Sequence, residues 1–334
     1  MMKVISPVRL LVFCMSISVL FCIMVWNYIS SQTTYAQRSG NNVNAGVYRF
    51  EDPTPSDRDF VVRQLEGINR PEDYFSRIVY NRVGKCGSRS MQAVISVLSK
   101  KNNFIFHLSP ISNVSHLRLL DLKEEVRLIT HLKPPMLYSR HIHYINFAKF
   151  GVQAPIYINL IRDPIERFSS SYHYKRYGDA RTPVERRRHW AEGEKERSIN
   201  DCILQNVTEC STGRLWYIVP YFCGQESICQ RPSTYSLQRA KQRLLDNYLA
   251  VGILEDFQGT LKIFEKLMPY HFKGAPDIWQ DISRGTVNNT STVGKEKIRP
   301  EVYAILKERM AMEYEFYNFA VKRFYHVKDQ LGIK

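Results

Sequence analysis

Residues 77–98, RIVYNRVGKCGSRSMQAVISVL, constrain the fold of this chain more than any other stretch, because they predict a strand, a tight turn and a helix in succession. The run Ile78–Tyr80 has the β-branched and aromatic composition of a strand. Gly84 and Gly87 allow the backbone to bend sharply after it. Hydrophobic residues then recur with helical spacing, at Met91, Val94, Ile95 and Leu98.

The turn of this unit has the composition of an anion-binding loop. Backbone N–H groups at a helix start bind anions, and Lys85, Ser88 and Ser90 add side-chain donors. The P-loop pattern G-x-x-x-x-G-K-[ST] is absent, because no glycine lies five residues before Gly84 and the lysine follows Gly84 directly. Two interpretations stay open for these residues, an anion-binding loop of another kind and a purely structural turn.

A second strand–helix unit is predicted in residues 155–177, PIYINLIRDPIERFSSSYHYKRY. A buried strand at Ile156–Ile161 is followed by Arg162, and Asp-Pro-x-Glu at residues 163–166 is typical of a capped helix start. Arg162 therefore lies at the carboxyl end of a strand, where open α/β sheets bind ligands. Either Arg162 pairs with a nearby carboxylate, or it holds a phosphate together with Ser170, two helical turns further on.

Taken together, these segments resemble the uronyl 2-O-sulfotransferase and heparan sulfate 2-O-sulfotransferase family of Golgi carbohydrate sulfotransferases. The resemblance extends from about residue 74 to about residue 325 and rests on seven motifs: YNRVGKCGSRS, SRHIHYINFAKFG, PIYINLIRDPIERF, YKRYGD, LWYIVPYFCGQ, LAVGILEDF and EYEFYNFA. The loop Gly-Lys-Cys-Gly-Ser is closer to the uronyl or Pipe-like branch than to the heparan branch, which carries Pro-Lys-Thr-Ala-Ser. The resemblance implies an α/β fold, in which a central parallel β-sheet with flanking helices forms a P-loop-like sulfotransferase domain.

The charge balance agrees with an acidic partner. The 334 residues include 47 Lys and Arg against 32 Asp and Glu, a formal charge of +15. Such a chain favours nucleic acid, an anionic membrane or a polyanionic glycan. Because no RNP, zinc-finger or helix-turn-helix pattern is present, we expect no nucleic acid and favour an anionic glycosaminoglycan or glycoprotein glycan.

The N-terminus predicts a membrane anchor. Residues 10–26 carry no charge, and residues 27–29 extend this segment toward the length of a spanning helix. Lys3 and Arg9 precede it and no basic residue follows before Arg38, so the N-terminus is expected in the cytosol. The predicted organisation is a cytosolic tail (1–9), a transmembrane signal anchor (10–29), a stem (30–73) and a luminal sulfotransferase domain (74–334) in the Golgi membrane. A cleaved signal peptide is the alternative, although no A-x-A site follows directly.

The cysteines fit an oxidising lumen. Beyond Cys14 and Cys22 in the predicted anchor, four of the five remaining cysteines allow three disulfide connectivities. The resemblance implies the pairs Cys202–Cys210 and Cys223–Cys229, each closing a short loop. A zinc site is the alternative, and it is disfavoured because the cysteines lack C-x2-C spacing. Cys86 is left as a free thiol in the anion loop. Sequons for N-glycosylation stand at Asn113, Asn206, Asn288 and Asn289.

The sulfate donor implied by the resemblance is 3′-phosphoadenosine 5′-phosphosulfate, with no metal. Lys85 is expected to stabilise charge on the leaving phosphate oxygen, assisted by Arg82. The 5′-phosphosulfate is expected in the loop after the first strand, and the 3′-phosphate at Arg162 and Ser170. The donor-binding residues predicted in this way are Arg82, Lys85, Cys86, Gly87, Ser88, Arg89, Ser90, Arg162, Ser170, Thr290 and Thr292.

The catalytic base is expected to be a histidine, because imidazole is neutral near pH 7 and accepts a proton. The alternating run SRHIHYINF predicts a strand or strand end that projects His141 and His143 from one face. By resemblance, His141 matches the catalytic base of the 2-O-sulfotransferases. His143 departs from the heparan branch, which has serine there, and is expected to contact the acceptor.

Arginines are expected to recognise the acceptor. A basic loop follows YKRYGD and contains Arg181, Arg186, Arg187 and Arg188. The alternative interpretation of this loop is a solvated or membrane-facing run of charges. Arg140, beside His141, is a further candidate, since a bidentate arginine–carboxylate pair favours a uronic acid over a neutral hexose. Later in the chain, residues 284–297 are predicted as a loop over the nucleotide and residues 302–325 as one helix.

The predicted reaction is sulfuryl transfer to the 2-hydroxyl of iduronate or glucuronate in a glycosaminoglycan such as dermatan or chondroitin sulfate. The first alternative is the same fold acting on heparan sulfate or on a non-glycosaminoglycan glycoprotein glycan, as in the Pipe-like branch. The second is a catalytically silent glycan-binding protein, and a nucleotide kinase is disfavoured by the missing P-loop pattern. Relatives in this family assemble as trimers, so a homotrimer is an expectation that no sequence feature tests.

Overall fold

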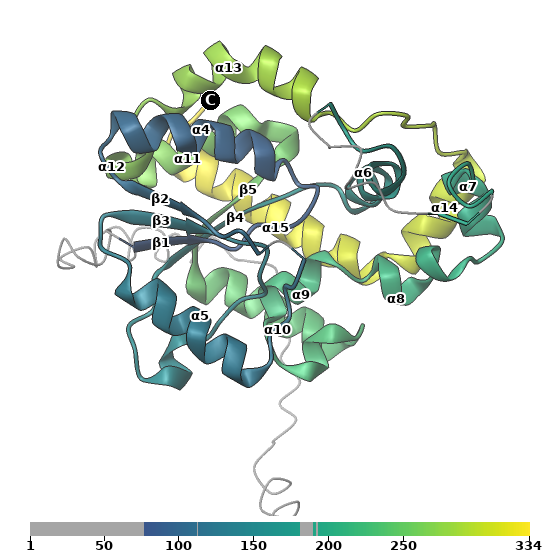
Figure 1. Cartoon of the computed structure of the whole chain (residues 1–334), viewed down its shortest axis with the longest axis horizontal. Coiled ribbons are helices and arrows are strands. Elements are labelled where there is room, and N and C mark those ends of the chain that lie inside the picture. Colours follow the sequence, from purple (N-terminus) through teal and green to yellow (C-terminus); the bar gives the residue numbers. More distant parts are fainter. Residues whose placement is uncertain (1–76, 112, 181–189, 192) are drawn as a thin grey trace, which may run out of the picture. The chain divides into compact units, whose positions relative to one another are not determined.

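Five parallel strands form the centre of the fold in the computed structural model, which describes residues 77–111, 113–180, 190–191 and 193–334 (Figure 1). They are β1 (Arg77–Tyr80), β2 (Ile105–Leu108), β3 (Met136–Ser139), β4 (Ile156–Ile161) and β5 (Tyr248–Ile253), in the spatial order β2-β3-β1-β4-β5. The register places Ile78 of β1 beside Leu137 of β3 on one side and Ile156 of β4 on the other. β3 and β4 are buried along their whole length, as expected of a parallel sheet covered on both faces.

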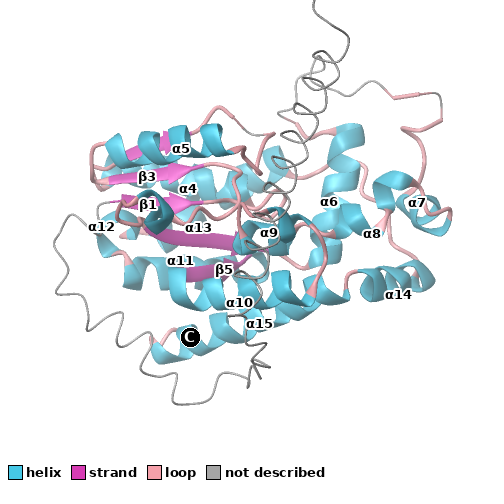
Figure 2. Ribbon diagram, turned by 90° about the horizontal axis from the view of Figure 1, so that it is seen from below, coloured by secondary structure: helices cyan, strands magenta, loops and turns pink. Residues whose placement is uncertain are grey.

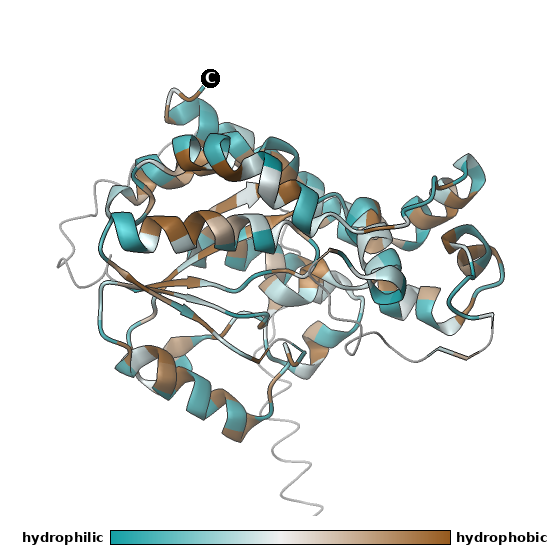
Figure 3. Ribbon diagram, turned by 45° about the horizontal axis from the view of Figure 1, so that its top comes forward, coloured by the Kyte–Doolittle hydropathy of each residue, from teal (hydrophilic) through white to brown (hydrophobic). Residues whose placement is uncertain are grey.

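Helices cover both faces of the sheet, and Figures 1 and 2 show the two layers from different sides. One layer contains α4 (Ser88–Lys101), α11 (Phe257–Leu267), α12 (Pro269–Phe272) and α13 (Ala275–Thr290). The other contains α5 (Leu119–His131), α9 (Ile218–Cys223) and α10 (Thr234–Asn247). The strands between them are largely coloured as hydrophobic in Figure 3. The predicted α/β class with a central parallel sheet and flanking helices is therefore confirmed.

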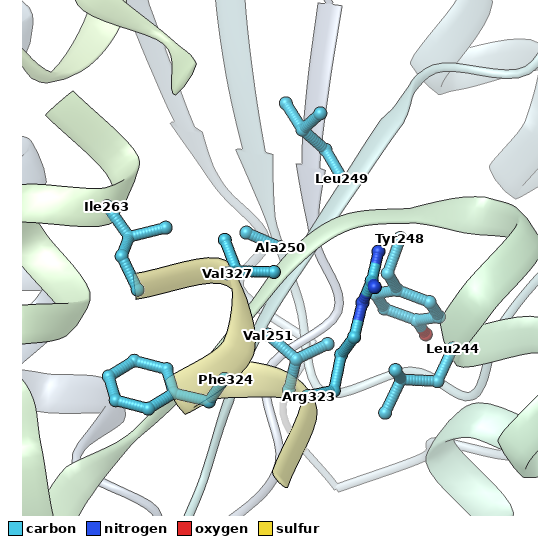
Figure 4. Close-up of a pocket in the computed structure, with 9 residues that line it drawn as sticks. All are labelled: Leu244, Tyr248, Leu249, Ala250, Val251, Ile263, Arg323, Phe324 and Val327. Atoms are coloured by element: carbon cyan, nitrogen blue, oxygen red, sulfur yellow. The ribbon is translucent and has the colours of Figure 1, made fainter. Parts of the chain in front are cut away.

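The long helix α15 (Ala311–Gln330) packs against β5 and α10. Figure 4 shows Phe324 and Val327 of α15 beside Ala250 and Val251 of β5, around a cavity of about 20 Å³. Apolar side chains from four elements line most of this space, and its volume suits a single water molecule. We interpret it as a packing defect of the core.

A smaller hydrophobic core lies beyond the carboxyl ends of the strands. It is formed by α6 (Pro164–Tyr177), α7 (Ile199–Leu204), α8 (Thr212–Leu215) and α14 (Pro300–Arg309), on the right of Figure 1. The disulfide Cys202–Cys210 lies in this core, and Cys223–Cys229 follows α9. Both predicted disulfides are confirmed, so these four thiols are not available as zinc ligands.

The order of the strands creates a ligand-binding crevice. After β1 the chain passes to β2 on one side of the sheet, and after β4 it passes to β5 on the other. Where the connections from two adjacent strands leave in opposite directions, the loops at the carboxyl ends of the strands separate and leave a crevice between them. The Lys85 turn follows β1 and Arg162 follows β4, so both predicted anion sites lie at this switch point.

Two predictions about helix boundaries are wrong. The predicted single helix over residues 302–325 is divided at Met310, because α14 packs against α7 while α15 turns toward β5. Residues 284–290, predicted as part of a loop, complete α13 instead. The Thr290 and Ser291 hydroxyls donate to the carbonyl oxygens of Thr286 and Val287, which satisfies acceptors in the last turn of this helix.

The N-terminal predictions lie outside the described residues. These are the cytosolic tail (1–9), the signal anchor (10–29), the stem (30–73) and the start of the luminal domain. Within the described part of the chain, no helix combines the length and hydrophobicity needed to span a bilayer. The asparagines of the four sequons are all exposed, which leaves each open to glycosylation.

Candidate active site

The turn between β1 and α4 has a backbone shape that exposes the helix start. Lys85 and Gly87 both adopt left-handed conformations, with φ of 65° and 75°. A Cβ atom on Gly87 would lie 2.5 Å from Leu254 Cδ1, so glycine is required there by conformation and by space. Gly87 is the N-cap of α4 and no side chain caps it, which leaves the first N–H groups of α4 available to an anion.

Two predicted donor-binding side chains in this turn are used internally. The Ser88 hydroxyl donates to the carbonyl oxygen of Val83 at 3.1 Å. Cys86 is a free, fully buried thiol, and burial raises its pKa to about 12, so it stays protonated. These residues therefore offer their backbone N–H groups to a ligand, while Ser90 is half-buried on the first turn of α4.

Lys85 lies in a cluster of cations. Its Nζ stands 3.7 Å from the centroid of the Tyr174 ring. The pKa of Lys85 is lowered to about 8, chiefly by burial and then by the nearby guanidinium of Arg89, whereas the Asp179 carboxylate acts in the opposite direction. Arg162 and Lys295 are close enough to lower the pKa of Lys85 as well. Such mutual repulsion between neighbouring cations is relieved when a polyanionic ligand binds.

Arg162 and Lys295 share one carboxylate. Arg162 Nη2 lies 2.8 Å from Glu166 Oε2, and Lys295 Nζ lies 3.7 Å from the same oxygen. Burial lowers the pKa of Lys295, and Arg162 contributes to the same shift. The Glu166 side chain is 55% exposed, so this ion pair is weak and readily exchanged for a ligand anion. The carboxylate partner considered for Arg162 is thus present, and it leaves the guanidinium accessible at 19% exposure.

Two predicted donor-binding hydroxyls meet although they are far apart in the sequence. Ser170 Oγ of α6 lies 3.1 Å from Thr292 Oγ1, in the segment after α13. The Val293 N–H donates to the carbonyl oxygen of Gly178, which holds that segment against the end of α6. Thr290 is not part of this contact, because its hydroxyl is bonded within α13.

His141 is held as a neutral imidazole with a defined tautomer. Its Nδ1 lies 2.8 Å from the carbonyl oxygen of Arg82, so Nδ1 carries the hydrogen and Nε2 keeps its lone pair. Burial lowers the pKa of His141 to about 4, and the Arg82 side chain contributes to the shift. The predicted base is therefore unprotonated at neutral pH. Arg82 itself is buried, and its Nε has no hydrogen-bond partner among the described residues.

Two of the predicted acceptor contacts, Arg140 and His143, have partners within the protein. Arg140 is buried in an ion pair with Glu125, to which the Tyr138 hydroxyl also donates. His143 is buried against the Tyr221 ring and lies 3.3 Å from Gln230 Nε2. Both side chains have internal partners instead of facing a cleft. The predicted basic loop with Arg181, Arg186, Arg187 and Arg188 lies outside the described residues.

Sequence reasoning missed three residues of the site, Tyr174, Asp179 and Tyr217. Arg89, predicted as a donor contact, forms an ion pair with Asp179 and donates to the Tyr174 hydroxyl. Tyr217 places its hydroxyl against Gly84, where a Cβ atom would lie 2.6 Å away. The motifs YKRYGD and LWYIVPYFCGQ contain these residues, so the signal was present without an assigned role.

The chain is similar to known proteins over most of its length. The family model described as "Sulfotransferase family" matches residues 72–320. Uronyl 2-sulfotransferase of Mus musculus is 42% identical over 268 residues, which are 78% of this chain and 65% of that protein. The Homo sapiens protein of the same name is 41% identical over the same length and the same shares. Heparan sulfate 2-O-sulfotransferase 1 of Cricetulus griseus is 33% identical over 277 residues, 80% of this chain and 75% of that protein.

The match spans slightly less than two thirds of the two uronyl 2-sulfotransferases. The family model, in contrast, covers most of the present chain, including both predicted anion sites of the switch point. The chain therefore belongs to the sulfotransferase family.

Proposed function

We propose that this protein transfers a sulfuryl group from 3′-phosphoadenosine 5′-phosphosulfate to the 2-hydroxyl of a hexuronic acid, in a glycosaminoglycan such as dermatan or chondroitin sulfate. The observation that carries the proposal is the pair of cationic sites at the switch point, the Lys85 turn after β1 and Arg162 after β4. The 42% identity to a uronyl 2-sulfotransferase supports the choice of acceptor.

The residues at the crevice fit a nucleotide that is anionic at both ends. The uncapped start of α4 and Lys85 would hold the 5′-phosphosulfate. Arg162, Ser170 and Thr292 would hold the 3′-phosphate, with Lys295 as a further cation. The donor would supply the sulfuryl group together with a stable bisphosphate leaving group.

The chain's own residues would provide base and electrostatic catalysis. His141 Nε2 would accept the proton of the acceptor hydroxyl, since its tautomer and lowered pKa keep that nitrogen unprotonated. The ammonium group of Lys85 would stabilise the negative charge that develops on the leaving phosphate oxygen. Because Lys85 is partly buried, this interaction is screened less than it would be in water.

The proposed location is the Golgi membrane, with a type II anchor at residues 10–29 and the catalytic domain in the lumen. Two disulfides and four exposed sequon asparagines support an oxidising, glycosylating compartment. A homotrimer is part of the proposal, and sedimentation of the purified protein tests it.

The test is a transfer assay on the full chain, purified in detergent with a radiolabelled sulfate donor. The acceptors are desulfated dermatan, chondroitin and heparan chains and a glycoprotein glycan, and labelled disaccharides are identified after digestion. Label on the uronic acid 2-position of dermatan or chondroitin is the expected result. Heparan sulfate is the second candidate, favoured by the 33% identity to a heparan sulfate 2-O-sulfotransferase. If neither dermatan or chondroitin nor heparan receives label, the proposed glycosaminoglycan acceptor is refuted.

A further inference from the structure

A cavity of about 120 Å³ lies between α6, α8 and the residue that precedes α9. Its volume is about ten times the space that one water molecule requires. Arg167, Ser171 and Lys175 of α6 line one side, and Arg214 of α8 and Tyr217 line another. None of the residues assigned above to the donor or to proton transfer lines this cavity.

Arg167 is the central feature of the cavity. Its side chain is only 2% exposed, and its Nε has no hydrogen-bond partner among the described residues. The guanidinium carbon stands 4.0 Å from the centroid of the Tyr217 ring. The described part of the chain provides no carboxylate within ion-pair distance of this side chain. A buried cation without a direct ion-pair partner is unfavourable, so the site favours an anionic ligand.

The neighbouring carboxylates are already committed elsewhere. The buried Glu313 carboxylate interacts electrostatically with Arg167. Its oxygens, however, accept the backbone N–H groups of Tyr217, Ile218 and Val219. Glu209, on the wall of the cavity, forms an ion pair with the buried Arg176. The cavity wall therefore carries an excess of positive charge, to which the exposed Arg214 adds.

Tyr217 connects this cavity to the proposed catalytic site. One face of its ring contacts the Arg167 guanidinium, and its hydroxyl touches Gly84, the residue before Lys85. The same hydroxyl lies 3.4 Å from that of Tyr221. An anion bound at Arg167 is thus separated from the Lys85 turn by a single side chain. A polyanionic chain that presents a hydroxyl near Lys85 would carry its next anionic groups within reach of the cavity.

We propose that this cavity is a binding subsite for a second anionic group, a sulfate ester or a carboxylate, of the acceptor glycan. The inference rests on the proposed function and names a feature of its substrate: a charged group close to the sugar that receives the sulfuryl group. Arg167 holds the anion from within the protein, and Arg214 holds it at the mouth of the cavity. The subsite fixes the register of the glycan, so that one particular sugar faces His141.

The first test compares Arg214→Glu with Arg231→Glu in the full chain. Both arginines are exposed, and Arg231 does not line the cavity, so it controls for the change in net charge. Binding of size-defined dermatan 4-sulfate oligosaccharides is measured by titration calorimetry in the presence of 3′,5′-bisphosphoadenosine. We expect Arg214→Glu to weaken binding about 10-fold and Arg231→Glu to leave it within about twofold. Equal losses in the two variants, or none, would overturn the subsite.

Two further acceptors identify the anion. Desulfated dermatan retains only carboxylates, and carboxyl-reduced dermatan 4-sulfate retains only sulfate esters. If Arg214→Glu loses affinity only for desulfated dermatan, the subsite binds a carboxylate, and if it loses affinity only for the carboxyl-reduced chain, the subsite binds a sulfate ester. If it loses affinity for both chains, the subsite accepts either group.

The buried residue is tested with Arg167→Met, with rescue by Arg167→Lys. We expect a loss of about 10- to 100-fold in oligosaccharide affinity for the methionine variant, with partial recovery for lysine. The melting temperature and the affinity for 3′,5′-bisphosphoadenosine verify folding. If Arg167→Met fails to fold, the Arg214 comparison still decides. These experiments measure binding and need no turnover. A wild-type protein that sulfates no acceptor would therefore refute the proposed function, whereas the subsite is judged by the oligosaccharide affinities alone.

Discussion

The lowered pKa of Lys85 makes nucleotide affinity depend on pH in a calculable way. In the free protein its pKa is about 8, so roughly nine tenths of the ammonium groups are protonated at pH 7 and roughly one tenth at pH 9. If the protonated form binds the nucleotide, affinity for 3′,5′-bisphosphoadenosine falls about 10-fold between these two pH values. The sign follows from linkage: bound phosphates raise the pKa of Lys85, so binding takes up a proton and weakens as the pH rises through the pKa of the free protein.

Titration calorimetry at pH 7, 8 and 9 measures this dependence, and buffers of different ionisation enthalpy report the proton taken up. Lys85→Met should bind weakly with little pH dependence. Lys85→Arg should retain affinity with a flat profile, since guanidinium does not titrate in this range. Burial also lowers the pKa of Lys295, so this residue could add to the pH dependence. Lys295→Arg serves as the matched control, because it removes the titration of Lys295 and keeps that of Lys85. A wild-type profile that is flat to pH 9, or a slope that persists in Lys85→Met, would refute the reasoning.

Three further predictions follow from named contacts. His141→Ala should retain bisphosphate affinity and lose about 10²- to 10⁴-fold in turnover, and near-normal turnover would dismiss His141 as the base. Arg162→Ala should weaken bisphosphate binding about 10- to 100-fold by calorimetry, whereas unchanged binding would place the 3′-phosphate elsewhere. Glu313→Ala should destabilise the fold by about 3 kcal/mol or more, because it leaves three backbone N–H groups without their acceptor. Calorimetric unfolding measures that loss against Glu313→Gln, and equal stabilities would contradict the assigned bonds.

Local sequence patterns predicted the two strand–helix units well. Asp163 accepts the N–H of Glu166 at 3.0 Å, as the capping pattern predicts, and Gly87 has the left-handed conformation that a sharp turn needs. These features depend on residues within a few positions of one another, so the sequence pattern contains the relevant interactions. Distant pairings are different. The contact of Ser170 with Thr292 joins residues 122 positions apart, and only the packing of the segment after α13 against α6 creates it.

The acceptor side shows the same division. Arg140 follows a strand and stands beside the predicted base, so its position suggested substrate recognition. The tertiary structure gives it Glu125 as a buried partner, which no local pattern could reveal. In the opposite direction, Arg167 is one of two arginines in the motif PIYINLIRDPIERF. Only the folded chain shows that it is buried beside a cavity, with no ion-pair partner among the described residues.

The sequence by itself determined the family resemblance, the α/β class, the tight turn after β1 and the position of a cation after β4. It could do so because strand, turn and cap preferences act over a few residues and the motifs occur in one order. Only the tertiary structure decided which cations remain available, because the free energy of a buried charge depends on the partners that packing brings to it. The strand order β2-β3-β1-β4-β5 placed Lys85 and Arg162 at one crevice. Long-range packing then paired Arg140 with Glu125 and left Arg167 without an ion-pair partner in the described part of the chain.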